Sequence, residues 1–182
     1  KVSRKRDEVL FTTSSAAMPI IALYVRAELE NVASFRAPED HLWCLDVQPS
    51  AGGDLRSKVV LDPSEEIELT GSRGSANLVI RDGKREHTMS MVHVKDLVHP
   101  LTPDSDWAPI VAFECRGLEP VAWHPTSGYE VVSGGDKVFD DVDLSEDPTM
   151  WADYCDKSNE PVQISGLEWR FDILKGAKVT KG

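Results

Sequence analysis

The stretch LEWRFDIL, residues 167–174, alternates apolar and charged side chains with a period of two. The apolar set comprises Leu167, Trp169, Phe171 and Ile173, and the charged set comprises Glu168, Arg170 and Asp172. Successive side chains of a β-strand point to opposite faces of the sheet. The stretch therefore predicts a strand with one face in a core and the other in water.

The same period recurs toward the amino terminus, in residues 23–30, 43–48 and 66–70. Between these runs lie turn-forming segments rich in glycine and proline, such as PSAGGD (49–54), GSRGS (71–75), HPLTPDSD (99–106) and SGGD (133–136). Short strands separated by turn signals predict an all-β fold of mostly antiparallel, coiled or sandwich-like sheets. One short helix is expected in DPTMWADYCDK (147–157), with Asp147 as its cap and Pro148 in its first turn.

Length and charge limit the classes of protein to consider. The chain has 182 residues, of which 41% are hydrophobic, which predicts one β domain over residues 18–182. Its net charge of −11 disfavours nucleic acid and acidic membranes as partners. No run approaches the roughly 20 apolar residues that cross a bilayer, so we expect a soluble protein that does not bind membranes.

Residues 1–17, KVSRKRDEVLFTTSSAA, differ in composition from the rest of the chain. They are basic and rich in serine and threonine, but lack the apolar segment of a secretory signal. They are expected to be either a flexible extension or a segment that targets an organelle such as the mitochondrion. The odd, scattered set of three cysteines favours a reducing compartment.

The segment IVAFECRGLEP, residues 110–120, places Cys115 near the end of an apolar run. On a strand, Cys115 shares a face with Val111 and Phe113, where a thiol is expected to be buried and inert. A nucleophilic Cys115 would need a base such as His124, which the sequence does not place. Arg116 and Gly117 are expected to form a turn that leaves the strand.

Four segments resemble the eukaryotic CXXC-motif-containing zinc-binding protein family. They are MPIIALYVRAELENV (18–32), GSRGSANLV (71–79), IVAFECRGLEPVAWHPTSGY (110–129) and MWADYCDK (150–157). The resemblance covers residues 18 to about 173, so residues 1–17 are expected to be an extension. It implies an all-β fold of coiled, bifurcated sheets in a small cytosolic protein, in a family for which no enzymatic activity is established.

The resemblance also implies two CxxC pairs that supply four thiolates to a tetrahedral structural zinc. When the flanking residues are aligned, the first pair falls at Pro49 and Gly52 and the second at Asp82 and Arg85. None of these positions holds a cysteine, and Arg85 would bring a positive charge to the metal. We therefore expect the zinc site to be lost and no cofactor to be bound.

Substitute ligands would support the alternative of a zinc-binding or metal-handling protein. The remnant that fits best is Asp82 with His87, because the three cysteines are isolated. His87, His93 and His99 recur at intervals of six, which on an extended segment is about 20 Å, and are expected to face solvent. Without zinc, two-residue turns at Gly52-Gly53 and Asp82-Gly83 are expected to support the two hairpins.

Three further features have both a functional and a structural interpretation. GSRGSAN (71–77) could bind an anion through its backbone near Arg73, but a plain turn is expected. The acidic run DDVDLSED (140–147) could bind calcium but lacks the EF-hand spacing, so a solvated loop is expected. The five tryptophans are expected in the core and its rim, unless Trp107 and Trp151 are exposed together as a docking patch.

These observations favour a non-enzymatic binding or scaffold module that acts through a protein partner. The turn surface expected to bind the partner consists of the positions that match the family motif, namely Arg73, Gly74, Arg116, Gly117 and Glu119. A thiol-dependent enzyme using Cys115 or Cys155 is a weaker alternative. The resemblance favours the cytoplasm.

Overall fold

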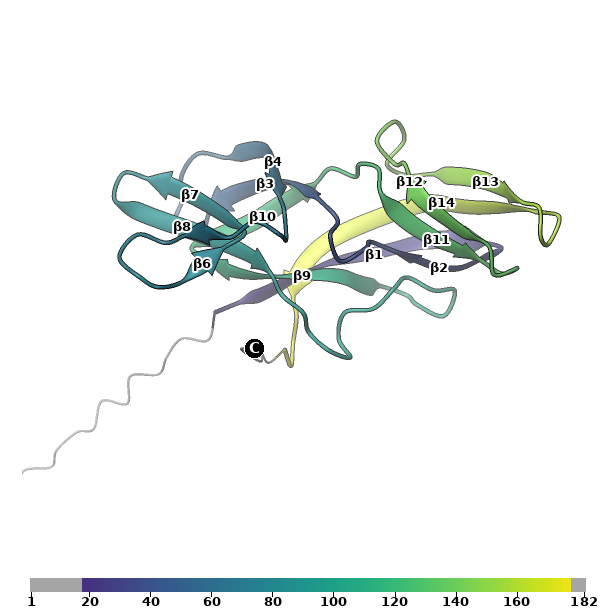
Figure 1. The fold of residues 1–182 in the computed structure, drawn as a ribbon, viewed down its shortest axis with the longest axis horizontal. Helices are drawn as coiled ribbons and strands as arrows, with labels where there is room; N and C mark the ends of the chain where they lie inside the picture. Colours follow the sequence, from purple (N-terminus) through teal and green to yellow (C-terminus); the bar gives the residue numbers. More distant parts are fainter. Residues whose placement is uncertain (1–17, 178–182) are drawn as a thin grey trace, which may run out of the picture.

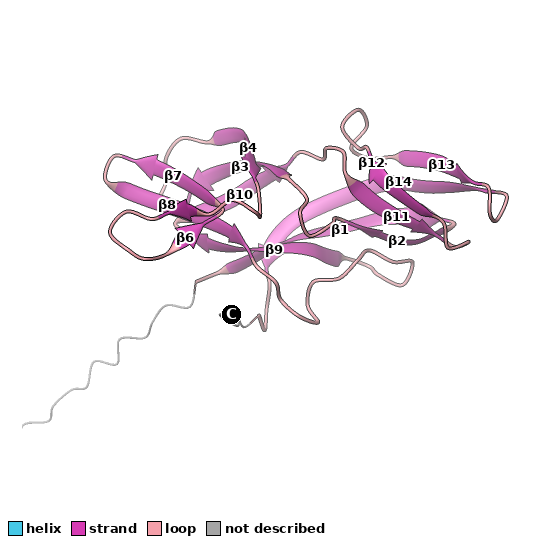
Figure 2. Cartoon of the chain, viewed as in Figure 1, coloured by secondary structure: helices cyan, strands magenta, loops and turns pink. Residues whose placement is uncertain are grey.

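A computed structural model describes residues 18–177 of the chain. The described residues form strands and turns only, as Figure 2 shows, so the all-β prediction is confirmed. Within this range, no helix is long and apolar enough to cross a membrane. The prediction for residues 1–17 lies outside the described residues.

The central sheet has six antiparallel strands, and its longest strands run along the length of the molecule (Figure 1). Its strands, in order across the sheet, are β13 (Trp151–Cys155), β14 (Glu160–Ile173), β1 (Ile20–Glu30), β9 (Ala108–Arg116), β8 (Arg85–Met91) and β7 (Leu78–Asp82). The strand predicted from LEWRFDIL is the second half of β14. It pairs with β1 so that Phe171 lies opposite Leu23 and Trp169 opposite Val25.

Smaller sheets lie toward the two ends of this central sheet (Figure 1). One consists of β10 (Leu118–Trp123), β3 (Trp43–Pro49) and β4 (Arg56–Leu61), and the other of β12 (Val138–Val142), β11 (Tyr129–Ser133) and β2 (Val32–Arg36). The run at 66–70 contributes only a short ribbon of β5 (Ile67–Glu68) with β6 (Ser75–Ala76). The chain passes directly from β9 into β10, which links the first of these sheets to the central one.

The core fills the space between the sheets and is rich in aromatic side chains. The fully buried Trp43 contacts Phe113 of β9 with ring centroids 6.0 Å apart, and Trp123 with centroids 6.4 Å apart. Tyr129 packs against Phe35 at 5.4 Å. Burial of such large rings contributes roughly 1.5–3 kcal/mol per side chain, so this cluster is a main source of stability.

The short helix predicted in residues 147–157 is wrong. Asp147 does accept a hydrogen bond from the Thr149 amide, at 2.9 Å, but this closes a turn and not a helix. The chain then enters β13, where Trp151 lies opposite Ile164 of β14. Pairing with the neighbouring strand therefore overrides the local signal from Asp147 and Pro148.

Candidate functional site

Gly117 forms the corner at which β9 turns into β10, as the sequence predicted. Its backbone has a φ of +67°, a conformation that glycine adopts without steric cost. Its carbonyl oxygen accepts a hydrogen bond from the Ser50 amide in the β3–β4 loop, at 3.0 Å. On the other side, a Cβ placed on Gly117 would lie 2.7 Å from Nδ1 of His87 in β8. The β3–β4 loop and β8 thus both contact Gly117.

The four positions aligned with zinc ligands lie in these two hairpins. Pro49 is buried at the end of β3, and Gly52 is exposed in the loop that follows. Asp82 and Arg85 are exposed and lie opposite each other at the end of the β7–β8 hairpin. Only Asp82 carries a side chain that could bind a metal. Among residues 18–177, no group of three or more His, Cys, Asp or Glu side chains is arranged to hold a metal ion. The residues present therefore do not fit the zinc that the family implies.

The two turns are supported by hydrogen bonds and glycine conformations within the hairpins. Gly52, Gly53 and Gly83 all have positive φ, as expected. The first turn is longer than the predicted two residues, and the Gly52 amide donates to the Pro49 carbonyl at 3.0 Å. In the second, Gly83 and Lys84 are the central residues, because Asp82 pairs with Arg85. This places the turn one residue later than predicted.

The prediction that His87 faces solvent is wrong, whereas His93 and His99 are exposed as predicted. Only 9% of His87 is accessible, because β8 is an interior strand between β7 and β9. The missing side chain of Gly117 leaves room for the imidazole ring. A long-range contact of this kind has no signal in the local sequence.

Cys115 is buried, with 1% of its surface accessible, as predicted. Burial, followed by the nearby carboxylates of Glu119 and Glu114, raises the pKa of its thiol to about 12. The base considered for it, His124, contacts another group, because its Nε2 lies 2.8 Å from Oδ1 of Asp46. A protonated, enclosed thiol without a base is a poor nucleophile.

Cys155 is also buried, at the end of β13. Hydrogen bonding, above all with Ser133, lowers the pKa of its thiol to about 7. The Ser133 Oγ lies 3.4 Å from the sulfur. The thiol is therefore partly deprotonated near neutral pH. The surrounding chain encloses it, which restricts the access of reagents.

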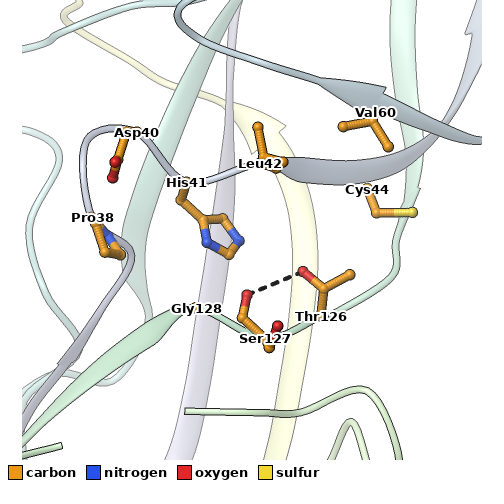
Figure 3. Close-up of a pocket in the computed structure, with 9 residues that line it drawn as sticks. All are labelled: Pro38, Asp40, His41, Leu42, Cys44, Val60, Thr126, Ser127 and Gly128. Carbon is orange, nitrogen blue, oxygen red and sulfur yellow. Dashed lines mark hydrogen bonds between the residues drawn. The ribbon is translucent and has the colours of Figure 1, made fainter. Parts of the chain in front are cut away.

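Cys44 and His41 line a pocket that no sequence pattern indicated (Figure 3). The pocket has a volume of about 400 Å³, and its wall also includes Leu42 and Val60. Burial lowers the pKa of His41 to about 4, so this imidazole is neutral at pH 7. Its Nε2 is enclosed and has no hydrogen-bond partner among the described residues. The pocket thus combines the apolar side chains of Leu42 and Val60 with polar side chains from Asp40, Thr126 and Ser127.

The predicted turn surface divides into two parts. Arg116, Gly117 and Glu119 lie together at the β9–β10 corner and are exposed, and Arg116 forms an ion pair with Glu114 at 3.5 Å. Arg73 and Gly74 lie in the separate turn between β5 and β6. The GSRGSAN segment forms a turn, in which the Gly74 amide donates to Ser72 Oγ at 3.2 Å.

The acidic and tryptophan-containing segments have structural roles. Asp140 and Asp141 belong to β12, and Asp143 accepts a hydrogen bond from the Ser145 amide at 2.8 Å, so the run forms a strand end and a turn. Trp107 and Trp151 are each half-buried. Trp107 packs beneath the guanidinium groups of Arg170, at 4.4 Å, and Arg26, at 4.8 Å.

The fold and the Gly117 corner define a class of protein. It is an all-β module in which the β3–β4 and β7–β8 hairpins both contact the turn between β9 and β10. Comparison with solved structures supports this class. A hypothetical protein from Plasmodium falciparum superposes with a TM-score of 0.77 and 26% identity, over 85% of this chain and 100% of that one. The crystal structure of C1orf123 superposes with a TM-score of 0.75 and 30% identity, over 85% of this chain and 99% of that one.

Sequence comparison identifies the family within that class. The model of the eukaryotic CXXC motif containing zinc binding protein matches residues 22–172. The rat protein of that name is 34% identical over 157 residues, which cover 83% of this chain and 96% of the rat protein. The human protein of the same name is 32% identical over the same shares. The chain therefore belongs to the CXXC-motif-containing zinc-binding protein family.

Proposed function

We propose that this chain is a non-enzymatic protein-binding module in which direct contacts replace the structural zinc of the family. The observation that carries the proposal is the Gly117 corner. There the Ser50 amide and the His87 ring reach Gly117 from the two hairpins that zinc would otherwise join. None of the four aligned positions supplies a thiolate.

The side chains left exposed around this corner suit a partner protein. Arg116 and Glu119 present opposite charges on either side of an exposed glycine, and Arg73 is a second exposed cation in the separate β5–β6 turn. We call Arg73, Gly74, Arg116, Gly117 and Glu119 the docking surface. Arginine is enriched in protein interfaces because its planar guanidinium group makes several directed hydrogen bonds.

Affinity purification of the full chain with Arg73→Ala and Arg116→Ala tests the docking surface. Both variants are expected to remain folded, because both side chains are exposed, and to lose partners that the parent recovers. Lys95→Ala removes an exposed cation outside the surface and serves as the matched control. Partner profiles that are the same for the parent and both arginine variants would overturn the proposal.

Elemental analysis with thermal melts tests the loss of zinc separately. The purified chain is expected to hold far less than one zinc per molecule, and a chelator is expected to leave its Tm unchanged. One zinc per chain with a chelator-sensitive melt would mean that other ligands hold the metal. Asp82, His87 and the three cysteines would then be the first residues to replace.

A further inference from the structure

One edge of β14 is uncovered after Leu167. Earlier in the strand, β13 covers this edge as far as the pair of Trp151 with Ile164, and the Leu167 amide still donates to the Thr149 carbonyl at 3.0 Å. From Glu168 to Ile173, β1 is the one strand that pairs with β14 among residues 18–177. The other edge of this half of β14 has no partner strand there.

The direction of the backbone groups follows from the antiparallel register. The Leu174 amide donates to the Ile20 carbonyl at 2.8 Å, so the even-numbered residues of this half of β14 exchange hydrogen bonds with β1. The amide and carbonyl groups of Trp169 and Phe171 therefore point to the uncovered edge. The Ile173 amide points the same way and donates to Oδ1 of Asp172 at 2.7 Å.

A groove of about 470 Å³ lies between the start of β10 and the apolar face shared by β1 and the second half of β14. Its apolar wall includes Ile21 and Phe171, which are half-buried, and Ile173, which is 58% exposed. Its acidic side chains are Glu119 and Asp172, both exposed. The groove thus combines apolar surface and negative charge, and its Phe171 and Ile173 belong to the part of β14 whose backbone edge is open.

We propose that this groove binds an extended, basic segment of a partner protein, which adds to β14 as a strand. The open backbone of Trp169 and Phe171 selects an extended segment, since hydrogen bonds to a strand edge require one. Apolar side chains of the segment contact Phe171 and Ile173 on one face, its Lys or Arg side chains on the other face meet Asp172, and Glu119 adds negative charge beside the apolar wall. The net charge of −11 disfavours an acidic segment. The inference rests on the proposed docking function, because Glu119 belongs to both surfaces.

Fluorescence anisotropy with two labelled peptides tests the charge and apolar preferences. The probes are Lys-Val-Lys-Val-Lys-Val-Lys and the same peptide with Glu in place of Lys. The full chain is expected to bind the lysine peptide at least tenfold more tightly. Glu119→Lys with Asp172→Lys is expected to weaken that binding at least tenfold. Asp104→Lys with Glu146→Lys gives the same change in net charge at exposed positions outside the groove and is expected to have little effect. Equal losses of affinity for the lysine peptide in both double variants would overturn the proposal that Glu119 and Asp172 belong to the binding site.

Amide hydrogen exchange measured by NMR tests the strand pairing itself. The lysine peptide is expected to slow exchange at Trp169 and Phe171, while Glu168, Arg170 and Asp172 are protected with or without it. Binding without protection at Trp169 and Phe171 would overturn strand addition. Protection already present in the free chain would mean a different occupant: a second copy if it depends on concentration, or another segment of the chain if it does not.

Ile173→Lys separates this inference from the proposed function, because Ile173 lies outside the docking surface. The variant places a positive charge on the apolar wall and is expected to lose both the lysine peptide and the partners recovered by affinity purification. If Ile173→Lys leaves the recovered partners unchanged while Arg116→Ala removes them, the groove is not the partner site. The proposed function would then stand without it.

Discussion

At the scale of single residues, His41 links protonation to folding. Its ring packs between Trp43, with centroids 4.7 Å apart, and Tyr129, with centroids 4.3 Å apart, and is 5% exposed. Burial lowers its pKa from 6.5 to about 4. The unfolded chain therefore binds a proton at this site at a higher pH than the folded chain does. The free energy of unfolding should fall as the pH drops from about 6.5 to about 4, by up to about 3 kcal/mol.

The variant His41→Phe isolates this contribution, because it keeps a ring between Trp43 and Tyr129 but cannot be protonated. Urea unfolding at pH 7 and pH 4.5 is expected to show a smaller loss of stability in the variant than in the parent. Carboxylates such as Asp46, whose pKa is lowered by hydrogen bonds from the Lys58 amide and His124, lose their contribution at lower pH in both proteins. Equal losses in the two proteins would show that His41 is not buried in the neutral form.

The three cysteines should differ in reactivity with a thiol reagent. Cys44 is half-buried beside the pocket, whereas Cys115 and Cys155 are enclosed. Iodoacetamide at neutral pH is expected to label one site per native chain, and three sites after unfolding in urea, as counted by intact mass. The Cys44→Ser variant should lose the native label. Rapid native labelling of Cys155 would show that the lowered pKa of its thiol matters more than its burial, and would revive a thiol-based activity.

At the scale of elements, the β9–β10 corner depends on the absence of a side chain at Gly117. Gly117→Ala would strain a positive φ and bring a Cβ to 2.7 Å from the His87 ring. Gly83→Ala is the matched control, since its φ is also positive, at +58°, but its Cβ would meet open space. We expect about 1 kcal/mol of destabilisation for Gly83→Ala and at least twice that for Gly117→Ala.

Urea unfolding of a third variant separates the two causes of this effect. Adding His87→Ala to Gly117→Ala removes the clash but leaves the strained backbone. The double variant is expected to lose less stability than the separate effects of Gly117→Ala and His87→Ala would give together. If the two effects simply add, the ring and the corner do not interact, and the replacement of zinc by this contact would lose its support.

The elements that the sequence predicted correctly are those whose signal is local and periodic. The charged and apolar faces of LEWRFDIL gave the second half of β14, and the apolar neighbours of Cys115 gave its burial. The predictions that failed depend on pairing between distant segments. Asp147 and Pro148 carry a helix signal, but the residues after them pair with β14 and form β13. His87 looks like a surface histidine until β7, β9 and Gly117 are placed around it.

The predictions for the candidate site also divide into those that could be made from the sequence and those that depend on distant segments. The alignment of Pro49, Gly52, Asp82 and Arg85 with lost ligands came from the resemblance alone, and the structure places them in two hairpins that contact one corner. The pocket at Cys44 and the open edge of β14 had no signal in the sequence. An edge strand differs from an interior strand only because it lacks a neighbouring strand on one side. Which strands lack such a neighbour depends on the whole sheet.

At the scale of the whole molecule, the final prediction is that zinc binding can be restored. The variant carrying Pro49→Cys, Gly52→Cys, Asp82→Cys and Arg85→Cys returns four thiols to the positions that the family motif indicates. It is expected to bind one zinc per chain and to melt at a higher temperature with zinc than with chelator. A structural zinc contributes on the order of 10 kcal/mol of binding energy, which exceeds the cost of about 1 kcal/mol for a cysteine at the positive φ of Gly52.

Two partial variants show whether the hairpins act together. Pro49→Cys with Gly52→Cys, and Asp82→Cys with Arg85→Cys, each supply two thiols from one hairpin and are expected to bind zinc much more weakly than the fourfold variant. If the fourfold variant fails to fold alone, refolding with zinc measures the same coupling. A folded fourfold variant that binds no more zinc than either partial variant would show that the two hairpins do not converge on a common site. In that case the Gly117 corner would not replace a lost metal, because there would be no shared site for zinc to occupy.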